Sequence, residues 1–288
     1  VTHKDGTLGK LGSGGFRTAY SVDINLKDGS KKSIVAKLGF THPREVELFK
    51  RWQGRNLVPE TYGFIEGTHG GLLFQERVEA PTLRKVMESG DAFEKSRAAK
   101  AVAALDGSLA FSGLKTDADG NLLATHILDL GAENILIKDG RAIIVDADPK
   151  FLVSRPLHEY LAYMLVYRDI YFQGDEYNAY LARLRDVFVR EKGESAGTML
   201  FAAVLKKARA GIAQGGQFQL FSKYAGSIPD DVDAVFPDFK TGSVLGSNEY
   251  LRYISQGALP PGNQVGVDYA WDVRIPAAVD AFLASVGQ

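Results

Sequence analysis

The chain has 288 residues, which is enough for one large domain or two modest ones. Apolar residues make up 45% and charged residues 24%, the balance of an ordinary globular protein with a sizeable core. The formal net charge of −1 gives no indication of a nucleic-acid-binding protein, and the absence of cysteine excludes disulfides, thiolate metal sites and cysteine catalysis.

The first part of the chain has the pattern of a β-sheet. Residues 8–15 are glycine-rich and lead into residues 16–26, where apolar and polar residues alternate as in a half-buried strand. A KDGS turn followed by an apolar strand at 31–40 predicts a β-hairpin. The other elements predicted here are a helix at 41–52 and strands at 58–67 and 71–78.

Beyond a joint near residues 76–82 the pattern becomes mainly helical. Two short apolar strands at 134–137 and 142–145, joined by a KDGR turn, predict a second hairpin within this part. The region 214–264 is rich in Gly, Pro and Ser and is predicted to be loop-rich. The predicted helices are 79–90, 96–112, 157–172, 175–192 and 275–286. We therefore expect an α+β fold with a small β-rich part before a larger helical part.

The glycine-rich turn at Gly12, Gly14 and Gly15 is the first candidate site feature. Such a turn between two strands lets backbone amides approach a phosphate closely, although by itself it is equally typical of a plain hairpin. Lys37 lies at the end of the next strand among apolar residues, where a lysine needs a partner. Glu45 or Glu47 on the following helix would supply one.

Three polar residues around the second hairpin form another candidate group. Asp129 precedes the first strand, Asn134 begins it, and Asp146 ends the second strand, so the hairpin would bring Asn134 and Asp146 to the same end. An asparagine carbonyl and a carboxylate make a hard oxygen site suited to Mg²⁺. Asp129 would then be free to accept a proton from a hydroxyl nucleophile, or to orient it.

Taken in this order, the motifs resemble those of the protein-kinase-like superfamily. LGSGGFRTAYSV is similar to its glycine-rich loop, VAK to its strand lysine, EVELFKRW to its first helix, DLGAENILI to its catalytic loop and VDAD to its magnesium-binding motif. The resemblance covers about residues 8–172 and implies a bilobal fold. Its lobes would be a small β-rich N-lobe at 1–79 and a larger helical C-lobe at 80–288, together one kinase-like domain.

The resemblance also implies roles for individual residues. Asp129 would be the catalytic base, and Lys37 would hold the α- and β-phosphates of ATP while pairing with Glu45. The backbone of Glu76 and Val78 would contact adenine. The other implied ligands are Gly12, Gly14 and Gly15 for the phosphates, and Asn134, Asp146 and Asp148 for Mg²⁺, with Mn²⁺ as an alternative ion.

Several positions depart from the family pattern. Arg17 replaces the third loop glycine, Ile127-Leu128 replaces the usual His-Arg, and Gly131 stands where serine/threonine kinases usually carry lysine. Only PKFLVSRP separates Asp148 from the next predicted helix, which leaves no room for an ordinary activation segment. We therefore expect an enzyme that is active without loop phosphorylation or is switched by an activating partner.

Three functions are compatible with these motifs. The first is a compact protein kinase acting on Ser/Thr hydroxyls, similar to those that bacterial pathogens inject into host cells. The second is a small-molecule kinase of the aminoglycoside or choline type, with region 214–264 as its substrate pocket. The third is a member of the fold that transfers AMP, or one that only binds. ATP/Mg-dependent transfer to a protein is the preferred hypothesis.

We expect no membrane span, since no apolar run is long enough. The expected location is the cytoplasm, or a host cell into which the protein is secreted.

Overall fold

The computed structural model describes residues 9–13, 17–25, 27–39, 43–67, 71–127, 130–146, 152–169, 171–222 and 271–287. The strands are β1 Gly9–Ser13, β2 Arg17–Asn25, β3 Lys31–Gly39, β4 Thr61–Ile65, β5 Gly71–Glu76, β6 Lys115–Thr116, β7 Leu122–Ile127, β8 Ile135–Lys138, β9 Arg141–Ile144 and β10 Leu152–Pro156. The helices are α1 Pro43–Gln53, α2 Leu83–Ser89, α3 Ala92–Ser112, α4 Leu157–Asp169, α5 Asp175–Lys192, α6 Glu194–Ser222 and α9 Trp271–Ser285. The fold is α+β.

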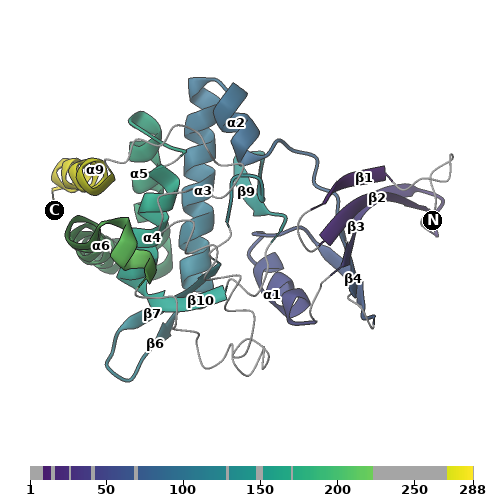
Figure 1. Cartoon of the computed structure of the whole chain (residues 1–288), viewed down its shortest axis with the longest axis horizontal. Helices are drawn as coiled ribbons and strands as arrows, with labels where there is room; N and C mark the ends of the chain where they lie inside the picture. The colour runs from purple at the N-terminus through teal and green to yellow at the C-terminus, as the bar shows by residue number, and fades with distance from the viewer. Residues whose placement is uncertain are drawn as a thin grey trace.

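The first five strands form one antiparallel sheet in the order β1-β2-β3-β5-β4. The predicted hairpin is confirmed: β2 and β3 pair in register around the KDGS turn, where Gly29 takes a left-handed φ of 84°. One face of the sheet carries a small buried cluster of Val22, Ile34 and Ala36. The sheet lies at one end of the molecule and the long helices at the other, with α1 between them (Figure 1).

The helical part is organised around helices buried on all sides. Every residue of α4 from Tyr160 to Asp169 is buried, and α3 is buried through most of its second half. α3 packs on α5, α4 on α6, and α6 on α9. α3 starts with a capping box, in which the Asp91 side chain accepts from the Glu94 backbone and Glu94 reciprocates. No described helix is long and apolar enough to cross a membrane.

Helix α1 follows the sheet lysine in sequence but packs with the helical part. Phe49 and Trp52 are buried in the same hydrophobic cluster as α3, α4 and α5, and so are Leu57 and Val58 just after the helix. The carbonyl of Leu57 accepts a hydrogen bond of 2.8 Å from the backbone of Ile144 in β9. α1 is therefore attached to the helical part by apolar side chains and, just after its end, by a backbone hydrogen bond.

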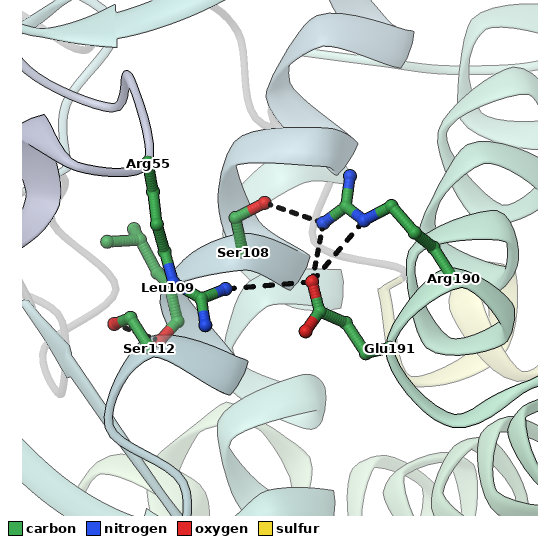
Figure 2. A network of polar contacts seen from close by, with 6 residues as sticks. All are labelled: Arg55, Ser108, Leu109, Ser112, Arg190 and Glu191. Carbon is green, nitrogen blue, oxygen red and sulfur yellow. Dashed lines mark hydrogen bonds and ion pairs between the residues drawn. The ribbon is translucent and has the colours of Figure 1, made fainter.

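Polar contacts add to this attachment. Arg55 lies just after α1 and reaches Glu191 in the last turn of α5, with Nη1 to Oε1 at 3.6 Å (Figure 2). Arg190 shares the same carboxylate at 2.8 Å and donates to the Ser108 hydroxyl of α3 at 3.3 Å. The network joins three segments that are distant in sequence.

Two elements differ from the sequence prediction. The prediction that region 214–264 is loop-rich is wrong for 214–222, because α6 continues through Ser222; residues 223–264 lie outside the described part. A three-stranded sheet, β10-β7-β6, was not expected. Its central strand β7 leads towards Asp129, and β10 begins at Leu152, soon after Asp148.

Candidate functional site

The second hairpin is confirmed, and it brings the chain at Asn134 and at Asp146 to one end. β8 and β9 pair from Ile135↔Ile144 at the open end to the turn, where Asp139 and Gly140 have φ values of 51° and 75°. Beyond the last strand pair, the backbone N–H of Val145 donates to the Asn134 carbonyl at 2.9 Å. Both Asn134 and Asp146 are half-buried. An amide and a carboxylate are thus carried by neighbouring backbone segments.

The sheet lysine reaches this end of the hairpin. Lys37 is only 7% exposed, and its Nζ donates to the backbone carbonyl of Val145, the residue before Asp146. The ammonium also lies 5.6 Å from the centre of the Phe49 ring of α1, a cation–π distance. Because a buried ammonium is costly unless polar groups surround it, its placement beside Val145 indicates a polar environment at this point.

The structure describes only some of the residues predicted to pair with Lys37 or to form the phosphate-binding loop. The backbone of Glu45 lies in α1, but its side chain is outside the described part, whereas Glu47 is described and exposed. Gly12 is an exposed residue of β1, and a Cβ added there would meet nothing within 4 Å. The remaining predicted site residues Gly14, Gly15, Asp129 and Asp148 are outside the described residues.

The predicted adenine contacts lie on the connection between the sheet and α2. Glu76 ends β5, and its backbone N–H donates to the Glu60 carbonyl at 2.7 Å, while Val78 is half-buried in the connection. The connection is then held to the hairpin, because the Ile137 N–H of β8 donates to the Pro81 carbonyl at 2.9 Å. Sheet, connection and hairpin are therefore linked by backbone hydrogen bonds.

The loop before β8 is held from two sides. On one side, the α2 backbone N–H of Arg84 donates to the Ala132 carbonyl at 3.3 Å, and the Arg84 guanidinium contacts Glu133 at 2.6 Å. On the other, Nη1 of Arg168 in α4 donates to the Leu130 carbonyl at 3.1 Å. Leu130 itself is fully buried. The residue next to Asp129 in the chain is thus fixed by a charged side chain from a central helix.

Arg168 belongs to a buried polar group that was not anticipated. Asp106 in α3 accepts two bonds of 2.8 Å from Arg168 and one of 2.9 Å from the Tyr180 hydroxyl, and all three residues are fully buried. The Tyr160 hydroxyl donates to the Asp106 backbone carbonyl at 2.6 Å. A signal was present in the sequence: an aspartate within the apolar stretch AVAALDGSLAF and an arginine within LAYMLVYRDI each require a buried partner.

The surroundings raise the pKa of Arg168 and of the two tyrosines in this group. Burial works against the charge of Arg168, but the Asp106 carboxylate outweighs it and raises the pKa of Arg168 above its ordinary value. Burial likewise raises the pKa of Tyr160 and of Tyr180 well above 10.0, so both hydroxyls remain donors.

Comparison with known proteins gives no family. No protein-family model matches the sequence, and no curated protein matches it significantly. Function must therefore be inferred from the residues and their arrangement.

Proposed function

We propose that this chain is an ATP- and Mg²⁺-dependent phosphotransferase of the protein-kinase-like superfamily, and that its acceptor is a Ser/Thr hydroxyl of a protein. The observation that carries the proposal is the hydrogen bond from Lys37 to the carbonyl of Val145. It brings a cation from the sheet to the hairpin end that carries Asn134 and Asp146, about a hundred residues later in the chain. A cation beside two oxygen ligands is the charge arrangement that a metal-bound phosphate chain requires.

The order of the elements supports the same proposal. The lysine strand β3 is followed by α1, by β5, by a connection that leads to α2, and finally by the loop and hairpin with the polar residues. This is the order that the sequence motifs of the superfamily predict. The strand β10, which begins at Leu152, also supports the expected absence of an activation segment, because it leaves little chain after Asp148.

The residues at the hairpin fit a magnesium ion. Mg²⁺ is usually held in such enzymes by one or two protein oxygens together with substrate phosphates and water, and Asn134 and Asp146 offer such a pair. Among the residues that the structure describes, which do not include Asp148, no group of three or more His, Asp or Glu side chains could hold a metal ion by itself. When bound, the ion would neutralise charge on the transferring phosphoryl group.

The protein side chains would then have separate tasks. Lys37 would bind phosphate oxygens, since its ammonium lies at the hairpin end beside Val145, the residue before Asp146. Asp129 would accept the proton of the acceptor hydroxyl. Loss of Asp129 should therefore affect the chemical step, whereas loss of Asp146 should affect binding of Mg·ATP.

The decisive experiment supplies ATP labelled separately at the γ- and the α-phosphate, with Mg²⁺ and cell lysate, and follows label on gels and by intact mass. Label from γ-ATP on a protein supports the proposal. Label only from α-ATP would establish AMP transfer instead. ATP consumption that appears only with added small alcohols or aminoglycosides would establish a small-molecule kinase, and absence of ATP binding would leave a binding module.

Three variants assign the roles. Asp129→Ala should lower kcat by about 10²–10⁴-fold with Mg·ATP affinity nearly unchanged, measured by calorimetry. Asp146→Ala should weaken Mg·ATP binding itself. Asp139→Asn is the matched control, because Asp139 lies in the turn at the opposite end of the same hairpin and Asn tolerates its left-handed φ. Near-full activity of Asp129→Ala would contradict the assignment of the base.

A further inference from the structure

The carbonyl of Leu130 is held by a guanidinium whose other contacts leave it little freedom. Nε and Nη2 of Arg168 bind the two oxygens of Asp106 at 2.8 Å each, which fixes the plane of the guanidinium. Nη1 then points to the Leu130 carbonyl at 3.1 Å. The planar fork of arginine offers these separate donors at fixed angles, which a lysine ammonium does not.

The partner carboxylate is itself held rigidly. Oδ2 of Asp106 also accepts from the Tyr180 hydroxyl of α5, so helices α3, α4 and α5 all meet at this carboxylate. Arg168 and Asp106 are both fully shielded from solvent. The position of the Leu130 carbonyl is thus set by a side chain in the packed interior of the helical part and not by a surface loop.

Stability alone gives a weak reason for this arrangement. A buried ion pair often contributes no more than apolar residues of similar size, because desolvation offsets the attraction. The apolar stretches around Asp106 and Arg168 would accommodate such residues. What apolar side chains cannot do is bind the Leu130 carbonyl.

We propose that Arg168, oriented by Asp106, is a positioning residue that sets the backbone carrying Asp129 for phosphoryl transfer; the inference rests on the proposed function. Leu130 follows Asp129 directly in the chain, and its carbonyl lies in the peptide that joins Leu130 to Gly131. The bond from Arg168 fixes that peptide and, together with the buried Leu130 side chain, restricts the path of the chain directly after Asp129. The opposite side of the loop is held by Arg84. Displacement of a reacting group by about 1 Å can cost about 10²-fold in rate.

Two variants test this role. Arg168→Lys keeps a cation beside Asp106 but lacks the fork that binds Leu130 at the same time. The triple variant Asp106→Leu/Arg168→Met/Tyr180→Phe replaces the whole polar group by apolar residues. In both, we expect kcat per folded molecule to fall by about 10²-fold while KM for ATP and Mg·ATP affinity stay close to wild type. Arg183→Lys is the control, since Arg183 is an exposed arginine of α5 whose ion pair with Asp186 lies outside this buried group; its kcat should be unchanged.

A second readout does not depend on activity. Amide hydrogen exchange of a peptide that covers residues 128–134 should be faster in Arg168→Lys than in wild type, with exchange in α3 and α5 retained. Wild-type kcat in a folded Arg168→Lys or triple variant would overturn the proposal, and so would failure of both variants to fold, because the pair would then be purely structural.

The same experiments separate this proposal from the proposed function. If the wild-type protein transfers no phosphate and binds no Mg·ATP, the proposed function fails, and the catalytic part of the inference fails with it. If wild type is active, Asp129→Ala is inactive and Arg168→Lys is fully active, only the positioning role is wrong.

Discussion

The sheet and the helical part are packed in different ways. The sheet has a small buried cluster of its own, Val22, Ile34 and Ala36, while one continuous hydrophobic cluster runs through the helical part as far as α9. α1 is the informative element, because it lies between two sheet strands in sequence yet its Phe49 and Trp52 belong to the helical cluster. Because α1 also contacts β4 of the sheet, it is the element that joins the two parts.

This difference has a consequence for the candidate site. Asn134, Asp146 and the loop at Leu130 lie on backbone attached to the large core, whereas Lys37 comes from the sheet and bridges to that core through Val145. In the proposed function, the helical part would hold the metal ligands and the base. The sheet would contribute the phosphate-binding lysine.

The largest expected effect concerns α1. Phe49→Ala should reduce the free energy of unfolding by about 3–5 kcal/mol, because the buried ring leaves a cavity in the large core. Leu38→Ala is the control in the neighbouring strand, where the side chain is 54% exposed, and should change it by no more than about 0.5 kcal/mol. Urea unfolding measures both. Equal small effects would mean that α1 is not part of the helical core.

A somewhat smaller effect is expected where α5 and α6 approach closely. A Cβ at Gly197 would lie 2.5 Å from the Phe188 carbonyl oxygen and 2.6 Å from the Val189 Cα, both backbone atoms that cannot move alone. Gly197→Ala should therefore lower the free energy of unfolding by about 1–3 kcal/mol.

Gly211 provides the matched control within the same helix. A Cβ there meets nothing within 4 Å, so Gly211→Ala should be neutral or stabilise by up to about 1 kcal/mol through helix propensity. Thermal unfolding of the two variants compares them directly. A Gly197→Ala protein as stable as Gly211→Ala would show that the helical part is less tightly packed than its geometry indicates.

Local patterns predicted the local elements well. The alternation and turn residues gave both hairpins nearly at their observed bounds, and helical spacing gave α4 from Leu157, because these elements depend on neighbouring residues. The Gly-rich composition after Gln214 led to a wrong expectation of loop, since α6 continues to Ser222. Composition is a weak guide when a helix is already established by packing further up the chain.

Non-local arrangements could not be predicted in the same way. The pairing of β7 with β10 joins residues about thirty positions apart, and neither strand has a pattern that identifies its partner. Asp106 and Arg168 each stand out as a charge in an apolar helix, yet nothing in the sequence indicates that they bind each other or that Leu130 is their third partner. Lys37, Asn134 and Asp146 were predicted to act together because their order in the chain resembles the motif order of the protein-kinase-like superfamily, and their roles stay predictions.

The smallest expected effect concerns the polar attachment of α1 shown in Figure 2. Arg55 is 38% exposed and lies 3.6 Å from a carboxylate that Arg190 already binds at 2.8 Å. A double-mutant cycle of Arg55→Ala and Glu191→Ala should give a coupling energy of about 0.2–1 kcal/mol, decreasing with added salt. The exposed pair Arg183–Asp186 within α5 is the control for an ion pair that joins no separate segments.

The size of this coupling decides what attaches α1 to the helical part. A value below about 1 kcal/mol, beside a loss of several kcal/mol for Phe49→Ala, would mean that apolar packing fixes the helix and that the ion pair adds orientation only. A coupling energy well above that range and insensitive to salt would reverse this assignment. The boundary between the two parts would then be held by charge.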